Sequence, residues 1–93
     1  MAWFQKLIDA ILHPSWKAAE AEAALEQKAA AHPDLHWRTS VVDLMKVVGQ
    51  DSSLEARVHL AKELGYKGKL DGDAAMNDFL HQKVLEHLGI TRS

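Results

Sequence analysis

The second half of the chain is divided into three short apolar-periodic segments, each opened by a capping residue and closed by glycine. The segments are residues 41–48, 53–64 and 74–88, and the glycines are Gly49, Gly65 and Gly89. Glycine favours the end of a helix because it adopts a left-handed backbone at no steric cost. No stretch alternates apolar and polar residues as a strand would. The sequence therefore predicts an all-α fold, a small helical bundle of four to five helices with no sheet.

Side chains that can cap a helix precede each segment. They are Thr39 or Ser40, then Ser52 in an S-x-x-E capping box with Glu55, and then Asp71 or Asp73. Such oxygens accept hydrogen bonds from the unpaired N–H groups of a first helical turn. The predicted core stripes are Val41, Leu44, Met45 and Val48, then Leu54, Ala61 and Leu64, then Met76, Phe79, Leu80, Val84, Leu85 and Leu88. We expect Trp37 to pin the preceding connection onto this core and Arg57 to pair with a carboxylate or a helix C-terminus.

The first half contains two further helical segments. Residues 1–13 form an amphipathic helix, and a boundary is expected at His13–Pro14 because proline is tolerated only in a first turn. Residues 15–31 are rich in alanine and glutamate, which favour a helix but bury little. A His–Pro–Asp turn at residues 32–34 separates them from the C-terminal part, 34–93. At 93 residues, we expect one domain, 1–93, with one modest core.

The apolar stripe of residues 3–12 has two interpretations. If this helix packs on the rest of the domain, its large side chains belong to the core. If it does not, they form an exposed apolar face larger than monomers tolerate, and that face would bind a protein partner or mediate self-association. Aromatic side chains suit the centre of such an interface. The candidate partner-binding residues are Trp3, Phe4, Leu7, Ile8, Ile11 and Trp16.

Charge and composition argue against several classes of partner. The net charge of −2 provides no attraction to phosphate backbones, so nucleic acid is not expected. The apolar runs are shorter than the roughly 20 residues of a membrane-spanning helix, and the start lacks the pattern of a secretory signal. The absence of cysteine excludes disulfides and agrees with a reducing compartment, so we expect a cytoplasmic location.

Reactive side chains do not form a recognisable site. His32 and His36 are four residues apart, but Pro33 argues against a shared helical face, and a metal site needs further ligands. His81 lies on the apolar arc of the last helix, so we expect it to be partly buried and hydrogen-bonded. Asp71 and Asp73 lack the other ligands of a calcium loop. We therefore predict no catalytic residue, no metal ligand and no cofactor.

The C-terminal part resembles a known family of uncharacterised function. The segment HWRTSVVDLMKVVGQDSSLEARVHLAKELGYKG, followed by DAAMNDFLHQKVLEHL, is similar to the bacterial domain of unknown function 3597 over about residues 34–88. The resemblance implies a mainly helical fold and no known active site. Val58 and His59 stand where the family usually has charged side chains, and Gln50 where it usually has an apolar one.

Three classes of function follow. The first is a non-enzymatic protein-binding or scaffolding module, and the unusual Val58–His59 pair leaves open that the chain is a binder engineered on this scaffold. The second is a cell-wall-binding module, because ELGYKGKLDG is similar to a turn of small peptidoglycan-binding domains. This reading predicts a polar groove near Tyr66, Lys67 and Asp71. The third is an enzyme with a pocket around His81.

Overall fold

The computed structural model describes residues 2–11 and 17–90, with the side chains of residues 4–11 and 17–90, and these residues form five helices. The helices are α1 (Ala2–Ile11), α2 (Ala18–Ala29), α3 (Val41–Val47), α4 (Leu54–Glu63) and α5 (Ala74–Leu88). No strand occurs among the described residues. The predicted all-α bundle is therefore confirmed.

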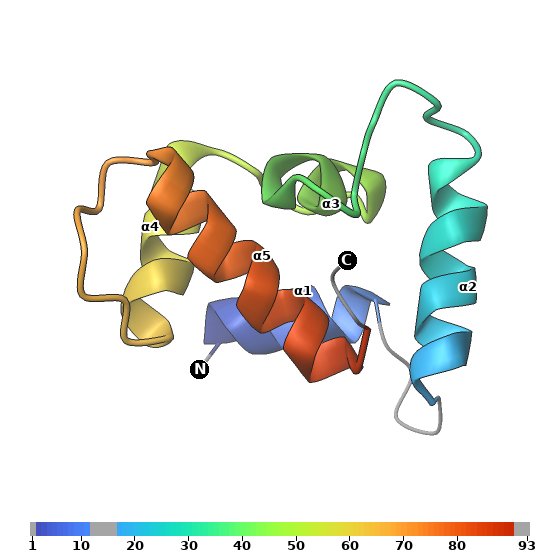
Figure 1. The fold of residues 1–93 in the computed structure, drawn as a ribbon, viewed down its shortest axis with the longest axis horizontal. Helices are drawn as coiled ribbons and strands as arrows, with labels where there is room; N and C mark the ends of the chain where they lie inside the picture. The colour runs from blue at the N-terminus through green and yellow to red at the C-terminus, as the bar shows by residue number, and fades with distance from the viewer. Residues whose placement is uncertain (1, 12–16, 91–93) are drawn as a thin grey trace.

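Helix α5 is the central element of the bundle. It crosses the front of the molecule in Figure 1 and packs against each of the other four helices. Its buried side chains are Met76, Leu80, His81, Val84, Leu85 and Leu88. This agrees with the predicted stripe, except that Phe79 is only partly buried and packs its ring against Tyr66 at a centroid distance of 4.9 Å.

The three C-terminal helices begin at side chains that cap their first turns. Ser40 Oγ accepts from the Asp43 N–H at 3.2 Å, and Asp73 Oδ1 accepts from the Met76 N–H at 2.9 Å. Helix α4 begins one residue later than predicted, because the cap is Ser53, whose Oγ accepts from the Ala56 N–H at 3.3 Å. The S-x-x-E pattern predicted Ser52, but the adjacent Ser53 offers the same hydroxyl and is the cap in the structure.

The same three helices end in one type of turn. At α4, the Tyr66 N–H bonds to the Ala61 carbonyl at 2.9 Å, the Gly65 N–H bonds to the Lys62 carbonyl at 3.1 Å, and Gly65 has φ +80°. This pair of bonds is the Schellman motif, in which a left-handed residue satisfies two carbonyls that the helix leaves unpaired. Equivalent bonds follow α3 and α5, so the predicted glycine stops are confirmed.

The buried faces of the two shorter helices differ in part from the predicted stripes. In α3, Val47 is buried and Val48 only partly so. In α4, the buried residues are Ala56, Leu60 and Ala61, whereas Leu54 is 46% exposed. The prediction was therefore wrong for Leu54, which is the first residue of α4, and right for Ala61. Small side chains at Ala56 and Ala61 let α4 approach its neighbours closely.

The first helix is docked on the bundle. Phe4, Leu7, Ile8 and Ile11 are buried in the same hydrophobic cluster as the side chains of α3, α4 and α5. The Phe4 N–H donates to Glu63 Oε2 of α4 at 2.9 Å. A carboxylate is favourable at this end of a helix because the first-turn N–H groups are unpaired and the helix dipole is positive there. Glu63 therefore fixes where α1 begins against α4.

Helix α2 stands at one side of the bundle in Figure 1, and a cluster on the following turn ties it down. Arg38 bonds to Glu22 at 2.7 Å and also to Glu26, and its guanidinium lies 4.4 Å from the Trp37 ring centroid. The bond to Glu22 makes the largest contribution to a raised pKa of Arg38, and the bond to Glu26 adds to it, while burial acts in the opposite direction. Trp37 itself is 4% exposed, so the prediction that it pins this connection is confirmed.

Two polar groups link the elements of the C-terminal part. His81 is 1% exposed, and its Nε2 lies 2.7 Å from the Trp37 carbonyl oxygen. Because a carbonyl only accepts, Nε2 is the donor. Arg57 donates to the Ser52 carbonyl and to Asn77 Oδ1, at 3.1 and 2.8 Å, and forms no ion pair with the residues that the structure describes. The predicted ion pair of Arg57 was wrong, since its partner is the neutral amide of Asn77.

Candidate functional site

The second interpretation of the first helix, an exposed apolar face, does not hold for the described side chains of residues 4–11. Phe4, Leu7, Ile8 and Ile11 are 2–5% exposed, because α4 and α5 cover this side of α1. The side chain of Trp3, the whole of Trp16 and the boundary at His13–Pro14 lie outside the described residues. Of the two interpretations of the stripe, the structure therefore supports docking for residues 4–11.

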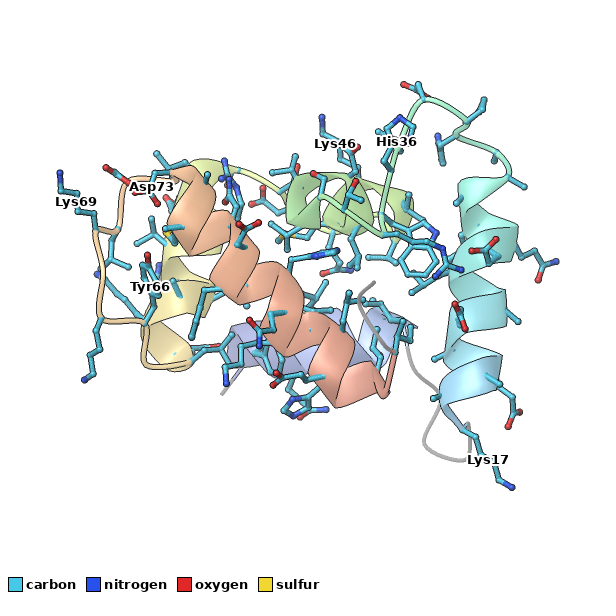
Figure 2. All side chains as sticks on the ribbon, in the orientation of Figure 1. Lys17, His36, Lys46, Tyr66, Lys69 and Asp73 are labelled. Carbon is cyan, nitrogen blue, oxygen red and sulfur yellow. The ribbon has the colours of Figure 1, made fainter. Side chains whose placement is uncertain are left out.

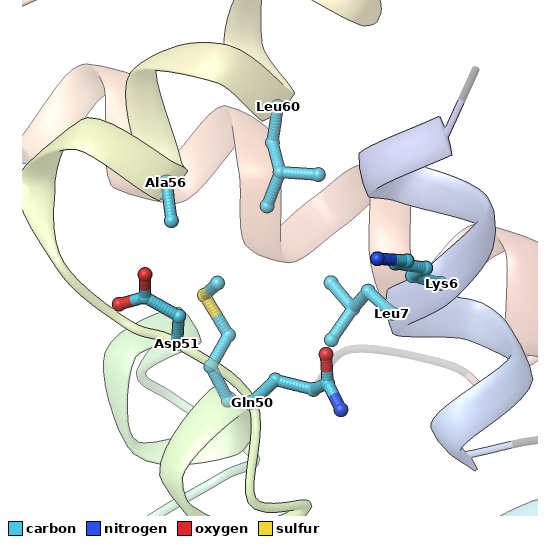
Figure 3. A pocket seen from close by; sticks show the side chains of 7 residues that line it. Lys6, Leu7, Gln50, Asp51, Ala56 and Leu60 are labelled. Atoms are coloured by element: carbon cyan, nitrogen blue, oxygen red, sulfur yellow. The ribbon is translucent and has the colours of Figure 1, made fainter.

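A cavity of about 250 Å³ opens between α1, α4 and the connection that joins α3 to α4. We call it the α1–α4 pocket. Its apolar wall consists of Leu7, Met45, Ala56 and Leu60, and its polar residues are Lys6, Gln50 and Asp51. Figure 3 shows Leu7 and Leu60 facing the same space, with Ala56 beside them. The pocket thus combines an apolar lining with three polar groups at its edge.

The glycine turn after α3 positions two of the polar groups. Gly49 has φ +74°, which reverses the chain so that Gln50 and Asp51 come directly after the end of the helix. Asp51 Oδ1 then accepts the Ser53 N–H at 2.9 Å, immediately before the cap of α4. Gln50 and Asp51 are therefore held between two helix ends rather than on a free loop.

The polar groups carry opposite charges on opposite sides of the pocket. The hydrogen bond from the Ser53 backbone, with a contribution from its hydroxyl, keeps the pKa of Asp51 below the ordinary value, so its carboxylate is ionised at neutral pH. In Figure 3 the Lys6 amine extends into the space from α1, whereas the Asp51 carboxylate lies across from it. Among the described residues, neither charge forms an ion pair. Both are available to a ligand.

The other residues singled out in the sequence are not gathered into a site. No group of three or more histidine and acidic side chains that could hold a metal ion occurs among the described residues. The ring of His81 is enclosed by the core, so a substrate does not reach it. Tyr66, labelled in Figure 2, is partly buried against Phe79. Lys67 and Asp71 are exposed on the turn that follows. Val58 packs against the core, and His59 is exposed.

Comparison with known proteins identifies a family for most of the chain. The domain of unknown function DUF3597 matches residues 5–91, which includes α1 and α2 as well as the C-terminal helices. The chain belongs to this family. The match is wider than the resemblance over residues 34–88, so the amphipathic start is part of the DUF3597 domain. No curated protein and no solved structure matches the chain.

Among the described residues, every helix is too short or too polar to cross a bilayer. Sequence reasoning did not find the α1–α4 pocket, because its residues come from three separated segments. The one signal was Gln50, a polar residue at a position where the resemblance predicts an apolar one, and it lines the pocket.

Proposed function

We propose that this DUF3597 domain is a non-enzymatic protein-binding module whose α1–α4 pocket receives one apolar side chain of a partner protein. The observation that supports the proposal is a pocket whose lining combines Leu7, Met45, Ala56 and Leu60 with three polar residues. Concave apolar pockets with a few placed polar groups are the usual form of binding sites. Such pockets also receive the anchor side chains of protein interfaces.

The size of the pocket favours a single side chain. An engineered cavity of about 150 Å³ holds benzene, and drug-sized ligands occupy sites of about 300–1,000 Å³. At about 250 Å³, the α1–α4 pocket suits a leucine or phenylalanine side chain. Burying such a side chain contributes about 1.5–3 kcal/mol, which is less than the cost of association. An isolated peptide should therefore bind very weakly, and a full partner, which adds further contacts, more tightly.

The test uses a seven-residue peptide with blocked ends, glycine and glutamine elsewhere and leucine at its centre. We expect it to shift the methyl NMR signals of Leu7, Met45 and Leu60, and a peptide with central alanine to shift them much less. Ala56→Leu, which fills the pocket, should abolish the response, whereas Ala75→Leu at an exposed position of α5 should not. If Ala56→Leu does not fold, Gln50→Phe blocks the pocket from its edge.

Two outcomes would overturn the proposal. One is a response that is equal for central leucine and central alanine, and the other is a response that survives filling of the pocket. Retention of the domain on insoluble peptidoglycan, with no response to the leucine peptide, would favour the cell-wall alternative instead.

A further inference from the structure

We propose that the partner segment recognised by the α1–α4 pocket is dipolar: its apolar anchor lies between an acidic side chain, which pairs with Lys6, and a basic side chain, which pairs with Asp51. This inference rests on the proposed function, because it specifies the chemistry that surrounds the anchor. It commits to a peptide segment of a partner protein as the occupant of the pocket.

The first argument is charge complementarity. Lys6 extends from α1 at one side of the pocket, and Asp51 lies at the other side at the start of the α4 connection (Figure 3). A segment with acidic residues on both sides of its anchor would place one of them against Asp51. A segment with basic residues on both sides would place one against Lys6. Only a segment of mixed charge is attracted at both edges.

The second argument is that the two charges are not committed elsewhere. By contrast, the exposed charge of Arg38 is used within the domain, where it pairs with Glu22 and Glu26. Lys6 and Asp51 make no such pair among the described residues. Asp51 uses Oδ1 for the Ser53 N–H, a bond that holds its carboxylate in place without neutralising its charge. The pocket thus presents one anion held by a backbone hydrogen bond and one exposed cation.

The third argument concerns Gln50, which favours a peptide over a small zwitterion. Its side chain is partly buried at the pocket and forms no hydrogen bond with the residues that the structure describes. A primary amide both donates and accepts, as does a peptide group. Gln50 can therefore bond to the backbone on one side of the anchor while Lys6 and Asp51 read the side chains that flank it.

The experiment compares four seven-residue peptides with blocked ends and a central leucine. They differ only at the two positions that lie two residues before and two residues after the leucine. The flanking pairs are glutamate with lysine, two glutamates, two lysines and two glutamines. Exposed ion pairs are individually weak, so the mixed-charge peptide should bind only about two- to tenfold more tightly than either like-charged peptide at low ionic strength. The difference should decrease in high salt because the charges are exposed.

Charge reversal provides the decisive variants. Lys6→Glu leaves two acidic edges, so the preferred peptide should become the one with two lysines. Asp51→Lys leaves two basic edges, so the preference should change to the peptide with two glutamates. Lys69→Glu and Asp34→Lys are matched controls, because both residues are exposed and neither lines the pocket. These controls should keep the preference for mixed charge.

The outcomes separate this inference from the proposed function. If all four leucine peptides bind the pocket equally, or if charge reversal leaves the preference unchanged, the dipolar partner is wrong while the apolar anchor stands. If a like-charged peptide binds the unmodified domain most tightly, the inference is also overturned. If none of the four peptides shifts the methyl signals of the pocket, the proposed function itself fails.

Discussion

Replacing Ile8 by alanine tests whether the first helix belongs to the folded unit. Ile8 is 5% exposed in the cluster that α1 shares with α3, α4 and α5. The substitution removes three carbon groups at about 0.8 kcal/mol each, and the cavity left behind adds to this cost. We therefore expect a loss of about 3 kcal/mol in the free energy of unfolding. For a domain of this size, Tm should fall by about 12–24 °C.

The assay is urea unfolding followed by circular dichroism and tryptophan fluorescence. The midpoint should move to lower urea while the slope stays unchanged, since the same surface unfolds. Gln5→Ala is the matched control on the exposed side of α1. It removes only the 2.8 Å hydrogen bond from the Gln5 amide to the Asp9 carboxylate. Pairs at this four-residue spacing on a helix contribute about 0.2–0.5 kcal/mol. An Ile8→Ala variant whose stability changed by less than about 0.5 kcal/mol would refute the docking of α1.

Three further predictions concern single groups. Ser53→Ala should lower stability by about 1 kcal/mol through loss of the cap of α4, and Ser52→Ala by clearly less, as measured by thermal unfolding; equal effects would contradict the assigned cap. His81→Ala should cost about 2–4 kcal/mol in urea unfolding, because it leaves a cavity and an unpaired Trp37 carbonyl, and a neutral effect would argue against that bond. Because the pKa of Asp51 is lower in the folded than in the unfolded protein, its carboxylate stabilises the fold at pH values above the unfolded pKa, and this contribution should disappear as pH falls through the folded pKa. Asp51→Asn should therefore reduce the loss of stability at acidic pH, and a variant with the same loss would contradict this contribution of Asp51.

Local chemistry made the helix ends predictable. The glycines after α3, α4 and α5 lie where the backbone needs a left-handed residue, and that requirement depends on a few neighbouring bonds. The caps were nearly as informative, and the one error, Ser52 in place of Ser53, arose because two serines adjoin. Such signals act within one turn of helix, so they can be read without knowing the rest of the fold.

The buried face of a helix and the hydrogen-bond partner of a side chain were harder to predict, because both depend on segments that are distant in the sequence. An amphipathic α1 has the same pattern whether it packs on its own domain or on another protein. The partner of Arg57, which is Asn77, is twenty positions away along the chain. The α1–α4 pocket places Lys6 of α1 and Asp51 of the α3–α4 connection on the same cavity. The hydrophobic periodicity of each segment does not predict which segments will be neighbours.

The bond from the Phe4 N–H to Glu63 has a consequence for how this protein is handled in the laboratory. An affinity tag that extended α1 backwards as continuous helix would offer the Phe4 N–H an acceptor four positions upstream, within the same helix. Glu63 would then lose this partner and the docking of α1 would be weakened. A tag joined through a glycine- and proline-containing spacer interrupts that extension and preserves the contact between the two helices.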